Sequence, residues 1–198
     1  ILAGLKKGYE VITTVFTFTA TNIPLFYMGI KIKFADIDIS TMNISVDSVK
    51  KLISKKTKAI VCVHYGGLPC DMTELQKLAN KYRIPIIEDA AHALGAKYEC
   101  GSMVGSGKYS DLCVFSFHPV KTISCGEGGA VSTRDSKLAT KLRQLRNHGM
   151  VREVEDIQNV EMGLDESGEL NPWYYEMICP GYNYRLSDIH SALGLSQL

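Results

Sequence analysis

LCVFSFHPVKTISCGEGG, residues 112–129, is the stretch of this sequence that decides the fold. Its first four residues form a short apolar run, which predicts a buried strand. Polar residues, Pro119, Lys121 and a cluster of glycines follow that strand. A lysine just past a buried strand is placed to lie in a partly desolvated pocket, where the neutral amine that attacks carbonyl groups is favoured. The alternative is an ordinary solvated loop lysine.

A second stretch, IPIIEDAAHALG at residues 84–95, brings further chemistry. Its apolar strand ends in two carboxylates, the second of them Asp89, and His92 follows. Ligands of parallel α/β sheets gather at the carboxyl ends of strands, so we expect Asp89 and Lys121 to lie beside the same ligand. Together they fit pyridoxal 5′-phosphate (PLP), which needs a lysine for a Schiff base and a carboxylate for its pyridinium nitrogen. His92 could cover the ring, and Ser116 could donate to the phosphate.

Strands alternate with helices along the chain, which predicts a doubly wound α/β domain. The predicted strands span 10–14, 30–38, 59–64, 84–89, 112–115 and 129–133, and the predicted helices span 1–8, 23–28, 45–54, 71–82, 135–148 and 189–198. Asp71, with Glu74 three residues later, is a predicted helix N-cap. Residues 151–170 are charged and uneven, and are predicted to form a mobile excursion.

The composition of the chain argues against several classes of protein. The 198 residues are 45% hydrophobic and 22% charged, which suits one sizeable globular domain. A net charge of +1 indicates no nucleic-acid partner. The apolar runs are of strand length, which predicts no membrane span. The six cysteines form no CxxC pair, so we expect no metal site, and with no disulfide framework we expect a cytoplasmic protein.

Five motifs along the chain resemble the nucleotide-sugar aminotransferase family, the DegT/StrS group of fold-type I PLP enzymes. They are EDAAHALG at 88–95, FSFHPVK at 115–121, GEGG at 126–129, RNHG at 146–149 and GYNYR at 181–185. They occur in the family's order, and the likeness spans essentially the whole chain. HPVKTI at 118–123, PWYYEM at 172–177 and the segment 186–198 are most similar to the branch that acts in pseudaminic acid synthesis.

This resemblance implies a fold. We expect residues 1–198 to form the PLP-binding large domain of a fold-type I transferase, a mostly parallel sheet sandwiched by helices. We also expect truncation at both ends, because relatives carry an upstream phosphate-binding segment and a smaller downstream domain.

The resemblance also implies residue roles around the cofactor. Lys121 and Asp89 would be catalytic, with Lys121 binding PLP and moving the proton, and Asp89 keeping the pyridine nitrogen protonated. His92 would pack over the ring, although a core histidine is the alternative. Ser116 would donate to the phosphate. Phe18 would stack on the ring, and the alternative is that it belongs to the core.

Further roles concern the substrate and a second subunit. Asn183 would donate to the phosphate of the neighbouring subunit's site, and Arg185 would lie near the substrate there, which implies a homodimer with shared sites. A surface ion pair is the alternative for Arg185. His118 and Tyr184 are further candidates for substrate binding. His64 is either a hydrogen-bonded structural histidine or a substrate contact.

The implied activity is transfer of an amino group from an amino acid, glutamate in the family, to a 4-keto-6-deoxy nucleotide sugar. Its product would feed surface polysaccharide or pseudaminic acid synthesis and flagellin glycosylation. The alternatives are a 3-keto-sugar nucleotide transaminase on the same scaffold and an inactive truncated fragment. One branch of the family acts as sugar dehydratases and carries histidine at the lysine position, and Lys121 argues against that branch.

Overall fold

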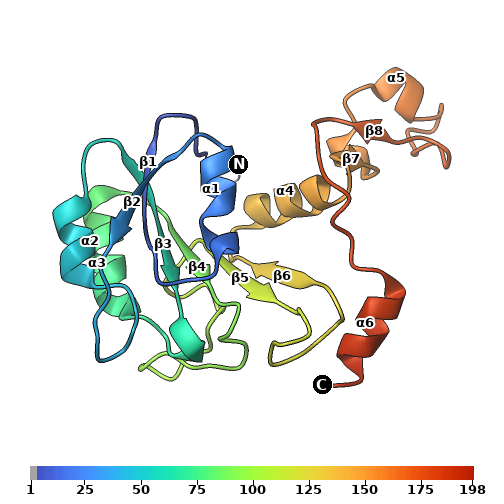
Figure 1. Cartoon of the computed structure of the whole chain (residues 1–198). Coiled ribbons are helices and arrows are strands. Elements are labelled where there is room, and N and C mark those ends of the chain that lie inside the picture. The colour runs from blue at the N-terminus through green and yellow to red at the C-terminus, as the bar shows by residue number, and fades with distance from the viewer. Residues whose placement is uncertain (1–3) are drawn as a thin grey trace. The chain divides into compact units, whose positions relative to one another are not determined.

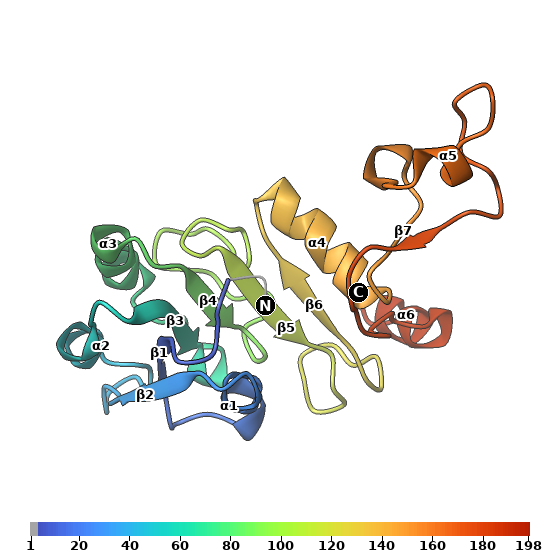
Figure 2. The same ribbon diagram turned by 90° about the horizontal axis from the view of Figure 1, so that it is seen from above.

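The computed structural model describes residues 4–198, which divide into two compact units (Figures 1 and 2). The first unit holds the residues up to Asp135 together with Asp188–Leu198, and the second holds Ser136–Ser187.

A six-stranded sheet forms the first unit, in the order β2-β1-β3-β4-β5-β6 (Figure 1). The strands are β1 (Glu10–Thr14), β2 (Lys31–Ala35), β3 (Thr57–Val63), β4 (Ile86–Asp89), β5 (Leu112–Ser116) and β6 (Gly129–Ser132). β1 to β5 pair in parallel, and β6 pairs antiparallel with β5. The prediction of a mostly parallel sheet is therefore confirmed. The carboxyl ends of the parallel strands share one edge, where such sheets bind ligands.

Helices cover both faces of this sheet. The helical elements of the first unit are η1 (Thr19–Thr21), α1 (Ile23–Tyr27), α2 (Val46–Leu52), η2 (Tyr65–Gly67), α3 (Met72–Tyr82) and α6 (Asp188–Leu195). In Figure 2, α2 and α3 lie on one side of the sheet and α1 on the other.

The strands supply the two cores that these helices cover. Neighbouring residues of a strand point to opposite faces. Ile12 accordingly packs in a cluster with Leu75 of α3, whereas Val11 packs in another cluster with Leu25 of α1. All four side chains are buried, and each contributes about 1.5–3 kcal/mol of hydrophobic stabilisation.

Local signals explain several element boundaries. The Asp71 carboxylate accepts the backbone N–H of Glu74 at 3.0 Å, which confirms the predicted N-cap of α3. The helix predicted over 1–8 is wrong for residues 4–8, which form no helix, and residues 1–3 lie outside the described part of the chain. The last helix ends at Leu195 rather than at 198.

The second unit has a small core of its own. It contains α4 (Ser136–Arg146), β7 (Met150–Val151), η3 (Val154–Asp156), α5 (Val160–Gly163) and β8 (Glu176–Met177), with β7 and β8 antiparallel. Val151, Ile157 and Tyr174 form its buried cluster. Residues 151–170 contain the short helical turns η3 and α5 and are therefore not irregular throughout. Their mobility stays a prediction. α4 ends before 148 because His148 and Gly149 both adopt positive φ.

Residues 4–198 contain neither a membrane-spanning helix nor a cluster of metal-ligating side chains. No helix there has the length and hydropathy needed to cross a membrane. No group of three or more histidine, cysteine, aspartate or glutamate side chains there is arranged to hold a metal ion.

Candidate active site

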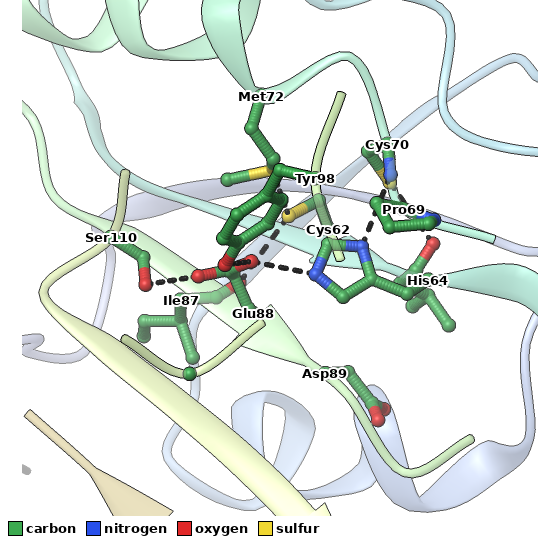
Figure 3. A network of polar contacts seen from close by, with 12 residues as sticks. Cys62, His64, Pro69, Cys70, Met72, Ile87, Glu88, Asp89, Tyr98 and Ser110 are labelled. Carbon is green, nitrogen blue, oxygen red and sulfur yellow. Dashed lines mark hydrogen bonds and ion pairs between the residues drawn. The ribbon is translucent and has the colours of Figure 1, made fainter. Parts of the chain in front are cut away.

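The two adjacent carboxylates at the end of β4 face opposite sides of the sheet. Glu88 is fully buried in a polar network, whereas Asp89 is half-buried and points away from that network (Figure 3). The alternation of side chains along a strand produces this separation. Asp89 is paired with Val63 on β3 and with Val114 on β5, which places it at the ligand-binding edge of the sheet.

Both oxygens of Asp89 accept a hydrogen bond. The hydroxyl of Thr21 donates to Oδ2 at 2.6 Å, and the backbone N–H of Ala91 donates to Oδ1 at 3.1 Å. Thr21 is a residue that the sequence reasoning missed. It lies three residues beyond Phe18, and nothing in the sequence distinguishes it from the neighbouring Thr17 and Thr19.

Lys121 and His92 are in direct contact. Lys121 Nζ lies 2.7 Å from His92 Nε2, although the two residues are 29 positions apart. Lys121 is half-buried, as expected for a lysine in a partly desolvated pocket, and His92 is exposed. The core-histidine alternative for His92 is therefore wrong. Because an ammonium group has only donors, the histidine nitrogen accepts when the lysine is charged.

The loop that carries Lys121 is tied down at several points. It joins β5 to β6, and its base is closed by hydrogen bonds from Phe117 N to Gly128 O and from Cys125 N to Phe117 O. Gly194 of α6 packs against Cys125, and a Cβ at that glycine would lie 2.4 Å from the cysteine sulfur. The lysine therefore sits on a fixed loop rather than on a free one.

Ser116 and Phe18 also lie in the first unit. Ser116 ends β5, and its Oγ accepts the backbone N–H of His118 at 3.3 Å. Within residues 4–198 the Ser116 hydroxyl donates no hydrogen bond, so its proton is available to an anion. Phe18 is 78% exposed, so the alternative that it belongs to the core is wrong. His118 is exposed, and its role with substrate stays a prediction.

Asn183, Tyr184 and Arg185 belong to the second unit. The backbone of Asn183 bridges to Asn147, and Arg185 Nη1 donates to the Asn147 side-chain oxygen at 2.8 Å. The Tyr184 ring stacks on Tyr182 with centroids 4.7 Å apart. Arg185 forms no ion pair in the described residues, so the surface-pair alternative gains no support. The roles of these three residues toward cofactor and substrate stay predictions.

Glu88, which points to the opposite face of the sheet from Asp89, accepts three side-chain hydrogen bonds. His64 Nε2 lies 2.6 Å and Tyr98 OH 2.7 Å from Oε2, and Ser110 donates to Oε1 (Figure 3). Burial acts to raise the pKa of Glu88, but these contacts, that with His64 foremost, outweigh it and lower the pKa. Tyr98 and Ser110 had no signal in the sequence, because both lie in a glycine-rich connection.

His64 is part of this buried network. Its Nδ1 accepts the backbone N–H of Cys70 at 3.2 Å, which assigns the ring proton to Nε2 and directs it toward Glu88. His64 is 1% exposed, which supports the structural-histidine interpretation and excludes a substrate contact.

The residues at the edge of the sheet fit PLP. Asp89 offers a carboxylate whose two oxygens are already oriented, and the Lys121 amine touches the His92 imidazole. Ser116 offers a hydroxyl proton and Phe18 an exposed aromatic face. A carboxylate, a lysine amine, an aromatic surface and a phosphate donor are the groups this cofactor requires.

Comparison with known proteins supports the same assignment. The model of the DegT/DnrJ/EryC1/StrS aminotransferase family matches residues 1–198. The uncharacterized protein MJ1066 of Methanocaldococcus jannaschii is 41% identical over 198 residues, which are 100% of this chain and 48% of that protein.

Two solved structures are also similar to this chain over nearly all of its length. PseC of Helicobacter pylori, an aminotransferase of pseudaminic acid biosynthesis, superimposes with a TM-score of 0.82 at 37% identity, covering 96% of this chain and 46% of PseC. DesI, solved in the presence of its TDP-sugar product, has a TM-score of 0.77 at 35% identity, covering 99% of this chain and 43% of DesI. The chain thus spans about half the length of the relatives it matches.

Proposed function

We propose that this chain, which belongs to the DegT/DnrJ/EryC1/StrS aminotransferase family, carries the cofactor site of a PLP-dependent sugar aminotransferase. Aminotransferases of this family use PLP, and similar solved structures include a PLP form and a PMP form. The observation that supports the proposal most strongly is the 2.7 Å contact between Lys121 Nζ and His92 Nε2. His92 follows Asp89 by three residues, and the Asp89 carboxylate is already oriented by its hydrogen bonds.

The division of work follows from the residues. When bound, PLP supplies an electron sink for the charge left after a proton leaves the carbon beside an amine. Asp89 would hold a proton on the pyridine nitrogen by its negative charge, because an ion pair in a partly dehydrated site favours the protonated ring. Lys121 would anchor the cofactor by Nζ.

Lys121 would also move a proton when its Nζ is not bound to the cofactor. Its free, neutral amine would accept the proton from the donor's α-carbon and return it to the cofactor carbon that receives the amine. His92 Nε2, which accepts a hydrogen bond from Nζ, would aim the amine during this transfer. The lysine therefore acts first as anchor and then as base and acid.

Other residues would position cofactor and substrate. Ser116 would donate to the phosphate and Phe18 would stack on the ring. Asn183 of a second copy would donate to the same phosphate, in a homodimer with shared sites. His118, Tyr184 and Arg185 are proposed to contact the substrate. The family motifs at these positions and the exposure of the side chains support these roles.

For the reaction, we propose a 4-keto-6-deoxy nucleotide sugar as acceptor and glutamate as donor, with surface polysaccharide or pseudaminic acid as destination and the cytoplasm as location. The likeness to PseC and to DesI, which has a TDP-sugar product, supports this choice.

The test uses the protein at its natural length. Incubation with PLP, glutamate and a UDP-linked 4-keto-6-deoxy sugar should form the 4-amino sugar and 2-oxoglutarate in equal amounts, measured by NMR. Lys121→Ala should form neither product. A 3-keto nucleotide sugar, supplied in parallel, tests the regiochemistry. Conversion of the 3-keto sugar alone would overturn the proposed acceptor but not the proposed reaction class.

A further inference from the structure

A short helical turn at the sheet edge reaches the carboxylate of Asp89. Thr21 closes η1, which follows β1, and its hydroxyl lies 2.6 Å from Asp89 Oδ2, 68 positions further along the chain. β3 lies between β1 and β4 in the sheet, so this bond links the turn after β1 to a strand that is not the sheet neighbour of β1. The side chain of Asn22 donates to the carbonyl of Thr14 at 3.0 Å and anchors the turn to the end of β1.

The hydroxyl groups of this turn form a chain with one direction. An ionised carboxylate only accepts, so the single proton of Thr21 is directed at Asp89. Thr17 Oγ1 lies 2.7 Å from Thr21 Oγ1, and because the Thr21 proton is already engaged, Thr17 must donate. Hydrogen bonds linked in this way polarise and strengthen one another.

The two donors on Asp89 come from different parts of the chain. Thr21 holds Oδ2, and the backbone N–H of Ala91 holds Oδ1. One donor on each oxygen removes the rotational freedom of the carboxylate, whose terminal torsion is otherwise broad. The plane of the carboxylate is therefore set before any ligand arrives.

We propose that Thr21 is a positioning residue, which aims the Asp89 carboxylate at the pyridine nitrogen of PLP, with Thr17 supporting it. This inference rests on the proposed function, because it concerns the same cofactor. Thr21 acts through Asp89 and has no part in the proton transfer itself.

The experiment compares Thr21→Val, which keeps the shape and removes the hydroxyl, with Thr21→Ser, which keeps the hydroxyl. Thr19→Val, an exposed position of the same turn, is the matched control. PLP dissociation constants are measured on the natural-length apoprotein, together with its melting temperature. Thr21→Val should bind PLP about tenfold more weakly, because the Asp89 carboxylate is no longer held in one plane and must be ordered when the cofactor binds. Thr21→Ser and Thr19→Val should bind like the unaltered protein.

A second ligand separates positioning from a general structural effect. In 1-deaza-PLP a carbon replaces the pyridine nitrogen, so Asp89 has no ring proton to hold. Thr21→Val and the unaltered protein should therefore bind 1-deaza-PLP equally. Equal PLP affinity in Thr21→Val and the unaltered protein, or an equal loss for both ligands, overturns the inference while leaving the proposed function intact. Failure of the unaltered protein to bind PLP overturns both.

Discussion

The side-chain amide of Gln197 forms hydrogen bonds with both the backbone N–H and the backbone C=O of Ser124. Its Oε1 accepts from Ser124 N at 3.0 Å, and its Nε2 donates to Ser124 O at 2.5 Å. Ser124 lies three residues beyond Lys121, so an amide just past the end of α6 fixes the loop that carries the lysine. Neither contact could be anticipated, since 73 residues separate the partners.

Gln197→Ala should therefore loosen the lysine loop. We expect a loss of about 1–2 kcal/mol in the free energy of unfolding, from two backbone hydrogen bonds, and a several-fold lower kcat. Gln76→Ala is the matched control, because Gln76 makes one comparable bond to the carbonyl of Lys108. Denaturant titration and steady-state kinetics measure both effects. A kcat in Gln197→Ala equal to that of the control would show that the contact does not serve the lysine.

His92 offers a ring surface and also a nitrogen, Nε2, that is hydrogen-bonded to Lys121 Nζ. His92→Phe should keep most of the PLP affinity, because the ring remains, but should lower kcat about tenfold, because one hydrogen bond to the lysine is lost. His92→Ala should lose affinity as well. Fluorescence titration and initial rates separate the two effects. Full activity in His92→Phe would exclude a role for Nε2.

Asp89→Asn keeps the size of the side chain and removes its charge. The pyridine nitrogen then loses its anionic partner, and we expect the rate of proton transfer to fall by about 10²-fold or more. Single-turnover measurements with glutamate report this step directly. A fall of only a few-fold would contradict the role proposed for Asp89.

The buried Glu88 predicts an acid-dependent stability. Its contacts lower its pKa below the ordinary value of 4.5, so the folded state binds this proton less readily than the unfolded state. The stabilisation is therefore complete above about pH 4.5 and is lost as the pH falls through the lower, folded-state pKa. Glu88→Gln should be less stable by about 1–3 kcal/mol at pH 7 and should show a shallower decline in acid. Denaturant titrations between pH 3 and 7 test this, and parallel curves for the two proteins would contradict it.

Sequence patterns were sufficient to predict the sheet and to identify Asp89 and Lys121 as the two principal side chains of the candidate site. The apolar runs before Asp89 and Lys121 are long enough to identify buried strands, and polar residues at strand ends mark the ligand-binding edge. The opposite orientations of Glu88 and Asp89 also follow from strand alternation. The sequence gives no means of locating Thr21, because a threonine in a turn has no periodicity that points to a partner 68 residues away.

The anchoring of PLP by Lys121 is the central claim, and one measurement tests it most directly. The natural-length protein is mixed with PLP, treated with borohydride, digested and analysed by mass spectrometry, beside Lys121→Ala. We predict that the peptide containing Lys121 carries the added mass of the reduced cofactor and that Lys121→Ala carries none. Labelling of another lysine, or equal labelling of both proteins, would contradict the account.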